Sequence, residues 1–366
     1  MAAEGGSTTG VMTERGYYAD HAATQRSAST LGFDLIAQAI GDVAAEAIAS
    51  DGTSVPWRIA DLGCAQGHNS MPPMNAAIAA LRARDGRDIQ VVHTDLPGND
   101  WATFFDNLEH DPASYQRTTT GTYPTVVGRS FYERVVPAGA LSLAWSSSSL
   151  HWLSASPGPV DDHFFVQMST DEVATERYRD RSRQDWLDFL GARSVELRPT
   201  ASVVFVDVLM GDDGSMGAEP LFQTLEDALR ARRDAGDLSV EEYRAIAYPT
   251  WFRDQAELRA PFAPTYTGPE GGTLELVALT PVDLPDPFLA SYRAAHDAHA
   301  YAANQAGFLR GFLEPSFRAA LAARPAADQS RLLDEVFADT AARIAADPDA
   351  VSPDYRLVTG RIRRTA

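Results

Sequence analysis

The sequence has 366 residues, of which 45% are hydrophobic, enough to bury a large core in one enlarged domain or two closely packed ones. Its formal charge of −19 and pI near 4.7 oppose the phosphate backbone of nucleic acid and anionic membranes, so the composition predicts a small-molecule partner and neither of those two. All 31 basic residues are arginines, which excludes Schiff-base and P-loop chemistry, because both need a lysine.

The first twenty residues have no basic start followed by an apolar run, so they do not read as a secretory signal. No later segment approaches the roughly 18 apolar residues that a membrane-spanning helix needs. We therefore expect a soluble, cytoplasmic protein. The absence of lysine, with abundant alanine, arginine and aspartate, indicates a GC-rich genome more than a functional demand.

Five apolar runs rich in valine and isoleucine alternate with segments of helical periodicity. The runs cover residues 57–63, 89–96, 123–128, 140–145 and 201–210. Strands that are apolar throughout and separated by helices form a parallel sheet that helices cover on both faces. The pattern therefore predicts an α/β fold.

Two further strands are expected at 272–279 and 354–364, and a long helical segment precedes each of them. Helical insertions late in a sheet should pack together over the carboxyl ends of the strands, where open α/β sheets bind ligands. The sequence thus predicts a core and a mainly helical cap that binds the substrate. The core would comprise residues 1–211, 272–284 and 354–366, and the cap residues 212–271 and 285–353.

The loop after the first predicted strand reads DLGCAQGHNS, residues 61–70. It begins D-x-G-x-A-x-G, which differs from the G-x-G-x-x-G fingerprint that receives a pyrophosphate in dinucleotide-binding enzymes. The spacing is a near match to the first motif of S-adenosylmethionine-dependent methyltransferases, although a glycine turn after a strand is often only a turn. The loop also holds Cys64, the single cysteine, so a disulfide framework and a cysteine-based zinc site are excluded.

Asp95 ends the second predicted strand, 28 residues after Gly67. A carboxylate at this place can accept hydrogen bonds from both ribose hydroxyls of an adenosine. The plainer reading is an aspartate that caps a turn in DLPGND. The two signals together are more specific than either one.

These motifs resemble those of the plant-type salicylic acid carboxyl methyltransferases, the SABATH family. YADHAATQ, from Tyr18 to Gln25, resembles the N-terminal element of the family, and IADLGCAQGHN and DLPGNDW resemble its first two motifs. GRSFYERVVP, SSSSLHWLS, YPTWFRDQAEL and RGFLEP follow in the family's order. The resemblance covers nearly the whole chain, and the protein is identified as a bacterial member of the family.

The resemblance implies a class I S-adenosylmethionine-dependent methyltransferase, with a Rossmann-like sheet of seven strands, an α-helical cap and a homodimeric assembly. S-adenosyl-L-methionine would be the cofactor and S-adenosyl-L-homocysteine its product. The implied cofactor-binding residues are Tyr18, Asp61, Gly63, Asn69, Asp95, Leu96, Ser130, Phe131, Ser146 and Ser147.

Gln25 and Trp152 would be the catalytic residues, because their N–H groups would orient the carboxylate of the substrate, with Tyr18 and His151 beside them. A carboxylic acid with a pKa of about 4 is already ionised at neutral pH, so neither a general base nor a metal is expected. The residues would act by positioning the acid and excluding water. The expected product is the methyl ester of a small carboxylic acid.

This chain has Ser148 where the family usually has a tyrosine, so its acyl pocket would lack one aromatic wall and be wider or longer. A medium- or long-chain fatty acid fits such a pocket at least as well as benzoate or salicylate. The candidates for lining it from the predicted cap are Trp251, Phe252, Phe308, Leu309 and Phe312.

Two alternatives stay open. Some family members methylate ring nitrogens, and His151 or His21 near the reacting atom could remove a proton from such a substrate. The other alternative is a sensor that binds S-adenosylmethionine without catalysis. Gln25 and Trp152 argue against a sensor, because a pure cofactor binder does not need donors on the substrate side.

Overall fold

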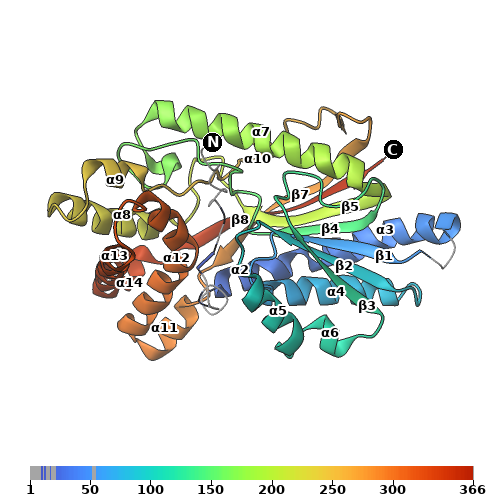
Figure 1. The fold of residues 1–366 in the computed structure, drawn as a ribbon, viewed down its shortest axis with the longest axis horizontal. Coiled ribbons are helices and arrows are strands. Elements are labelled where there is room, and N and C mark those ends of the chain that lie inside the picture. The colour runs from blue at the N-terminus through green and yellow to red at the C-terminus, as the bar shows by residue number, and fades with distance from the viewer. Residues whose placement is uncertain (1–9, 11, 14–16, 18–21, 52–54, 366) are drawn as a thin grey trace.

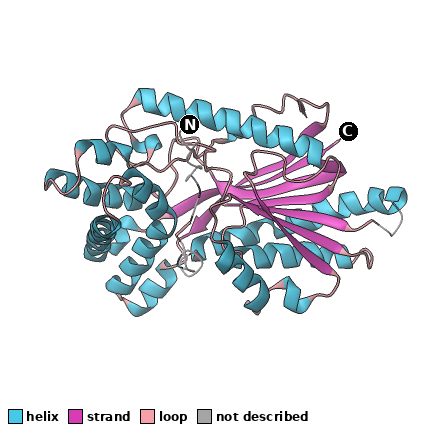
Figure 2. Ribbon diagram, in the orientation of Figure 1, coloured by secondary structure: helices cyan, strands magenta, loops and turns pink. Residues whose placement is uncertain are grey.

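A computed structural model describes residues 10, 12–13, 17, 22–51 and 55–365. A mixed sheet of eight strands runs through these residues in the order β3-β2-β1-β4-β5-β8-β7-β6 (Figure 2). The strands are β1 (Trp57–Leu62), β2 (Ile89–Asp95), β3 (Thr122–Gly128), β4 (Leu141–Ser147), β5 (Leu197–Val208), β6 (Tyr266–Thr267), β7 (Thr273–Pro285) and β8 (Asp354–Arg364). The first five strands in this order are parallel, and β8 runs antiparallel between β5 and β7. All seven predicted strands are present, and the eighth, β6, adds two residues at the edge.

Helices cover both faces of the parallel part of the sheet (Figure 1). On one face lies α7 (Glu172–Glu196); on the other lie α2 (Ala23–Ser29), α3 (Phe33–Asp51), α4 (Met71–Arg82), α5 (Trp101–His110) and α6 (Tyr115–Thr118). Successive strand residues point to opposite faces. In β5, Val204 packs in the core cluster that includes α3 and α4, whereas Val203 packs in the cluster that includes Phe189 of α7. Burial on both faces explains why the strands are apolar throughout.

The late helices gather at one end of the sheet (Figure 1). They are α8 (Glu219–Asp234), α9 (Val240–Ala245), α11 (Leu289–Ala295), α12 (Ala298–Ala320), α13 (Ala326–Ala346) and α14 (Pro348–Val351). Both α8 and α12 pack against α13, and the rings of Phe317 and Phe337 stack between α12 and α13. The two insertions therefore pack against each other.

One part of the first insertion lies with the sheet. Leu258 of α10 (Gln255–Arg259) is buried in the same cluster as Phe189, and β6 pairs with β7. Residues 255–267 thus adjoin the core, although the sequence placed them in the cap. None of the helices in the described ranges is long and apolar enough to cross a membrane.

Candidate active site

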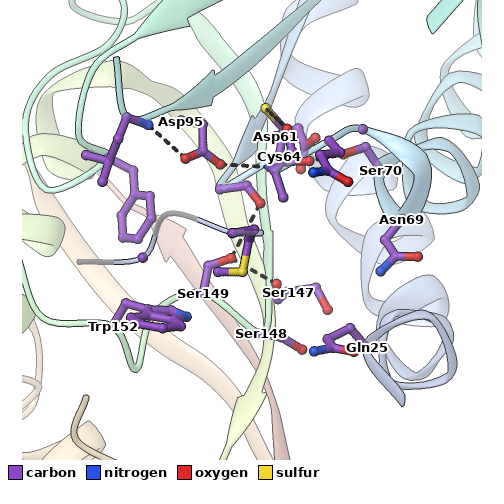
Figure 3. Close-up of a pocket in the computed structure, with 18 of the residues that line it drawn as sticks. Gln25, Asp61, Cys64, Asn69, Ser70, Asp95, Ser147, Ser148, Ser149 and Trp152 are labelled. Carbon is purple, nitrogen blue, oxygen red and sulfur yellow. Dashed lines mark hydrogen bonds between the residues drawn. The ribbon is translucent and has the colours of Figure 1, made fainter. Parts of the chain in front are cut away.

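A cavity opens at the carboxyl ends of the parallel strands (Figure 3). Loops that follow β1, β2, β3 and β4 line it, together with Gln25 of α2. Asp95 and Asp61 lie at one end of the view, and Gln25, Ser148 and Trp152 lie at the other. The sheet therefore brings together residues that are far apart in the sequence.

Three residues of the glycine-rich loop after β1 have left-handed backbone conformations, with positive φ angles. Gly63 and Gly67 have φ of 87° and 83°, and Ala65 between them has φ of 46°. A Cβ at Gly63 would lie 2.4 Å from the Ser149 hydroxyl oxygen, so this position has no room for a side chain. At Ala65 the methyl group fits, although its backbone conformation is one that glycine adopts with less strain.

Exchanging the two residue types should show this difference. Gly63→Ala should lower the free energy of unfolding by about 1–3 kcal/mol, because left-handed strain adds to the contact with Ser149. Ala65→Gly should stay within about 1 kcal/mol of wild type, because relief of strain offsets the added flexibility of the unfolded chain. Urea unfolding followed by circular dichroism measures both, and equal losses would contradict this account of the loop.

Asp95 is fixed by the backbone around it. Its carboxylate accepts hydrogen bonds from the Ala65 N–H at 2.7 Å and the Leu96 N–H at 2.8 Å. Burial, reinforced by the nearby Asp61 carboxylate, raises the pKa of Asp95 to about 6 despite these hydrogen bonds. Asn99 braces the same loop by donating to the Ala65 carbonyl at 2.7 Å.

Asp61 is held in place by a chain of hydrogen bonds between buried side chains. Its carboxylate lies 3.0 Å from Nδ1 of His93, whose Nε2 lies 2.9 Å from the Tyr115 hydroxyl. Asp61, His93 and Cys64 lie close enough together to hold a metal ion. However, both ring nitrogens of His93 already make hydrogen bonds, and burial raises the pKa of the Cys64 thiol well above its usual range. These contacts make the group a support for the loop.

The two serines at the end of β4 differ. The Ser146 hydroxyl donates to the Leu62 carbonyl at 3.0 Å, and Ser146 is fully buried away from the cavity. The Ser147 hydroxyl is buried, lines the cavity and has no hydrogen-bond partner among the described residues. The assignment of Ser146 to the cofactor is therefore corrected, because its hydroxyl joins β4 to β1.

A second, mostly apolar cavity adjoins the first and shares Met12, Gln25, Ser148 and Trp152 with it. Its other lining residues are Thr24, Ala28, His151, Val208, Met216, Ala218, Phe222, Tyr248, Phe252, Phe308, Phe312, Tyr355, Arg356 and Leu357. The side-chain carbonyl oxygen of Gln25 is buried and has no hydrogen-bond partner among the described residues. A polar atom without a partner thus lies where the two cavities meet.

His151 lines this second cavity and is held on both ring nitrogens. Its Nδ1 lies 2.6 Å from the Asp207 carboxylate and its Nε2 lies 3.3 Å from the Tyr248 hydroxyl. All three side chains are buried or nearly so.

Comparison with known proteins identifies the fold and chemistry. Residues 10–347 match the model of the SAM-dependent carboxyl methyltransferase family. The chain belongs to this family. The methyltransferase is 28% identical over 265 residues to O-methyltransferase acrG of Aspergillus aculeatus, covering 69% of this chain and 67% of that protein. It is 27% identical over 236 residues to gibberellic acid methyltransferase 2 of Arabidopsis thaliana, covering 56% of this chain and 59% of that protein.

The fold of the methyltransferase is shared with a solved structure, loganic acid methyltransferase with SAH. The TM-score is 0.76 at 17% identity, and the likeness covers 97% of this chain and 98% of that one. The predicted methyltransferase sheet with added helices is thereby confirmed. These relatives come from a fungus and a plant, so the bacterial origin stays a prediction.

The methyltransferase uses S-adenosylmethionine. Its first cavity has groups that suit parts of that molecule. The cavity offers the Asp95 carboxylate at one end, the unpartnered Ser147 hydroxyl, and a backbone without side chains at Gly63 and Gly67. Of the predicted cofactor residues, those that line it are Asp61, Gly63, Asn69, Asp95, Leu96, Ser130, Phe131 and Ser147. Tyr18 lies outside the described residues.

Two of the predicted substrate residues do not line either cavity. The Trp251 indole donates to Glu257 at 2.9 Å, and Leu309 is fully buried in the core cluster. These two assignments are corrected in favour of their neighbours: Phe252, Phe308 and Phe312 line the second cavity, as do Gln25, Ser148, His151 and Trp152.

Sequence reasoning missed several lining residues. Ser149 fills the space above Gly63, and Phe222, Tyr248 and Tyr355 line the apolar cavity from three separate segments. The serine run in SSSSLHWLS was a usable signal for Ser149. The three aromatic residues carried no signal, because aromatic residues in helices and strands are ordinary core residues.

Proposed function

We propose that the methyltransferase esterifies a carboxylic acid whose apolar tail occupies the second cavity, a medium- or long-chain fatty acid or an aromatic acid such as benzoate or salicylate. The observation that carries this proposal is that Gln25, Ser148 and Trp152 line both cavities. An acid with its carboxylate among them and its tail among Phe222, Phe252, Phe308 and Phe312 would place a polar end and an apolar end in matching surroundings. Relatives named for gibberellic acid and loganic acid support a carboxylate acceptor.

The chain's own residues would act by orientation. S-adenosylmethionine supplies a methyl group on a positively charged sulfur, which leaves readily when a nucleophile approaches in line. The Gln25 amide and the Trp152 indole N–H are uncharged donors, so they can hold a carboxylate without neutralising it and thereby weakening its oxygen as a nucleophile. The aromatic wall excludes water, which would otherwise solvate the carboxylate.

We propose that Asp95 binds the ribose hydroxyls of the cofactor in its ionised form. Because the pKa of Asp95 is raised to about 6, the affinity for S-adenosylmethionine should be full above that pH and fall as the pH drops through it. Titration calorimetry should show about tenfold weaker binding at pH 5 than at pH 7.5. Asp95→Asn should bind weakly at both pH values, and an unchanged pH dependence in this variant would assign the effect to another group.

Transfer of labelled methyl groups to a panel of acids tests the proposed function. The panel contains fatty acids of increasing length, benzoate, salicylate and indole-acetate, with xanthines for the ring-nitrogen alternative. Ester formation with at least one acid is expected. Labelled xanthine with no ester would favour nitrogen methylation, and cofactor binding with no transfer at all would favour a sensor.

Ser148 should set the length of acid that is accepted. It lies where the cavities meet and has φ of 52°, so Ser148→Tyr would place a ring there at some cost in backbone strain. We expect the preference among acids to move at least tenfold toward short or aromatic ones, the equivalent of about 1.4 kcal/mol. Competition between octanoate and benzoate measures this, with Ser148→Ala as the control; an unmoved ratio would reject the role of Ser148.

The resemblance of the sequence to its family also supports a homodimer, which we propose as the working assembly and which sedimentation equilibrium tests. The division into core and cap is likewise a proposal, refined by placing residues 255–267 with the core.

A further inference from the structure

The His151–Asp207 pair has no task in esterifying an ionised acid. His151 follows β4 and Asp207 lies in β5, and their exposed fractions are 4% and 5%. The 2.6 Å contact joins Nδ1 to a carboxylate oxygen, so Nδ1 carries the hydrogen. In the neutral ring, Nε2 is then the nitrogen whose lone pair can accept a proton.

The position of His151 makes that lone pair useful. The residue lines the apolar cavity beside Trp152 and Gln25, where the two cavities meet. The Tyr248 hydroxyl lies 3.3 Å from Nε2, and this is a long contact that the O–H of a bound phenol can replace as the donor. The arrangement of a base oriented by a buried carboxylate is the one that active sites use to remove a proton from a nucleophile.

We propose that His151 and Asp207 accept the proton of a phenol bound in the apolar cavity, so that the methyltransferase also forms methyl ethers of phenols. This inference rests on the proposed function, because it uses the same cavity as the acceptor site. The phenol hydrogen passes to Nε2 of His151, and the oxygen electron pair forms the bond to the methyl carbon. The carbon–sulfur bond breaks, and its electron pair stays on sulfur. His151 is the base and Asp207 is a positioning residue.

The lining of the cavity favours an aromatic acceptor. Four phenylalanines and two tyrosines surround it, and the ring of Phe252 meets that of His151 edge-on at 5.4 Å. A phenol has a pKa of about 10, so it enters protonated at neutral pH, whereas a carboxylic acid does not. Of the charged or titratable groups around His151, Asp207 and Tyr248 contact its ring. Tyr355 and Arg356 line the same cavity, and Arg253 donates to the carbonyl of the preceding residue, Leu150.

Two methyl acceptors that differ only in whether they must lose a proton test the role of His151. A 4-alkylphenol and the 4-alkylbenzoate with the same tail differ only in the reacting group, and both are offered at saturating S-adenosylmethionine. Asp207→Asn should lower ether formation by about 10²-fold, the scale of general base catalysis, and ester formation by less than about tenfold. Asp207→Glu should restore part of the ether formation, and calorimetry with S-adenosylmethionine checks that each variant is folded.

The wild-type pH profile gives a test that needs no variant. If His151 takes the proton, ether formation proceeds well below the phenol pKa and does not follow the fraction of free phenolate. If only free phenolate reacts, the rate keeps rising about tenfold per pH unit toward the phenol pKa near 10. Three results would overturn the inference. They are a rate that keeps rising toward the phenol pKa, equal losses of ether and ester formation in Asp207→Asn, and ester formation without ether formation in the wild type. Ether without any ester would instead reject the proposed function and leave this inference standing.

Discussion

Trp152→Phe should lower kcat/KM for the acid about 10- to 100-fold, the range expected when one hydrogen bond to a charged group is lost. The change removes the indole N–H and keeps an aromatic ring. The ring contacts Tyr248 edge-on at 5.0 Å, so much of the packing survives. The affinity for S-adenosylmethionine should stay within about threefold, because phenylalanine still closes that end of the first cavity. The loss is thus expected in transfer to the acid and not in cofactor binding.

Trp251→Phe is the matched control. It makes the same change in a tryptophan whose N–H donates to Glu257 and which lines neither cavity. Steady-state kinetics with the best acid of the panel should show less than about twofold change in this variant. If the two variants lost activity equally, general loosening of the protein would explain the result, and the Trp152 N–H would have no special role.

The sequence located the strands well because those residues are buried on both faces, which leaves an unbroken apolar run. Their ends were less certain. β5 begins at Leu197, four residues before the predicted start, and β7 continues to Pro285, six residues beyond the predicted end. Leu197 pairs with Leu141, and Pro285 pairs with Asp354. Pairing of this kind depends on the neighbouring strand and leaves no mark in local composition.

The site residues, like the strands, were predicted better in some places than in others. Motif residues such as Asp61, Asp95 and Ser147 line the first cavity, since the loops after β1, β2 and β4 meet at one edge of the sheet. Ser146 and Trp251 also lie within motifs but line neither cavity.

In the predicted cap, two residues assigned to the substrate lie next in the sequence to residues that do line the second cavity. Trp251 and Phe252 are neighbours outside the helices and strands, and their side chains pack in different core clusters. Phe308 and Phe312 are four residues apart on one face of α12, and Leu309 points elsewhere.

The end of α7 carries a buried ion pair that the motifs did not indicate, and this pair supports one wall of the first cavity. Arg193 and Glu196 are fully buried and lie 2.6 Å apart. Arg193 donates to the carbonyls of Phe131 and Glu133, both at 2.9 Å, and Glu196 accepts from the Val136 N–H at 3.0 Å. The pair therefore supplies partners for a loop that has no regular secondary structure, and that loop includes Phe131 of the cavity.

Arg193→Ala should lower the free energy of unfolding by about 3–5 kcal/mol, because it leaves the Glu196 carboxylate buried without its partner. S-adenosylmethionine should also bind more weakly, since the loop at Phe131 loses two of its hydrogen bonds. Urea unfolding and calorimetry measure the two effects. Arg129→Ala is the control, because Arg129 pairs with Glu133 on the surface of the same loop and should change stability by less than about 1 kcal/mol.

A double variant, Arg193→Met with Glu196→Leu, separates the charge from the anchoring. If the ions stabilise the protein only by neutralising each other, an apolar pair of similar volume should restore stability. We expect little recovery, because the carbonyls of Phe131 and Glu133 and the N–H of Val136 would remain buried without partners, at about 1–3 kcal/mol each. Full recovery of both stability and cofactor affinity would show that the loop holds its shape unaided.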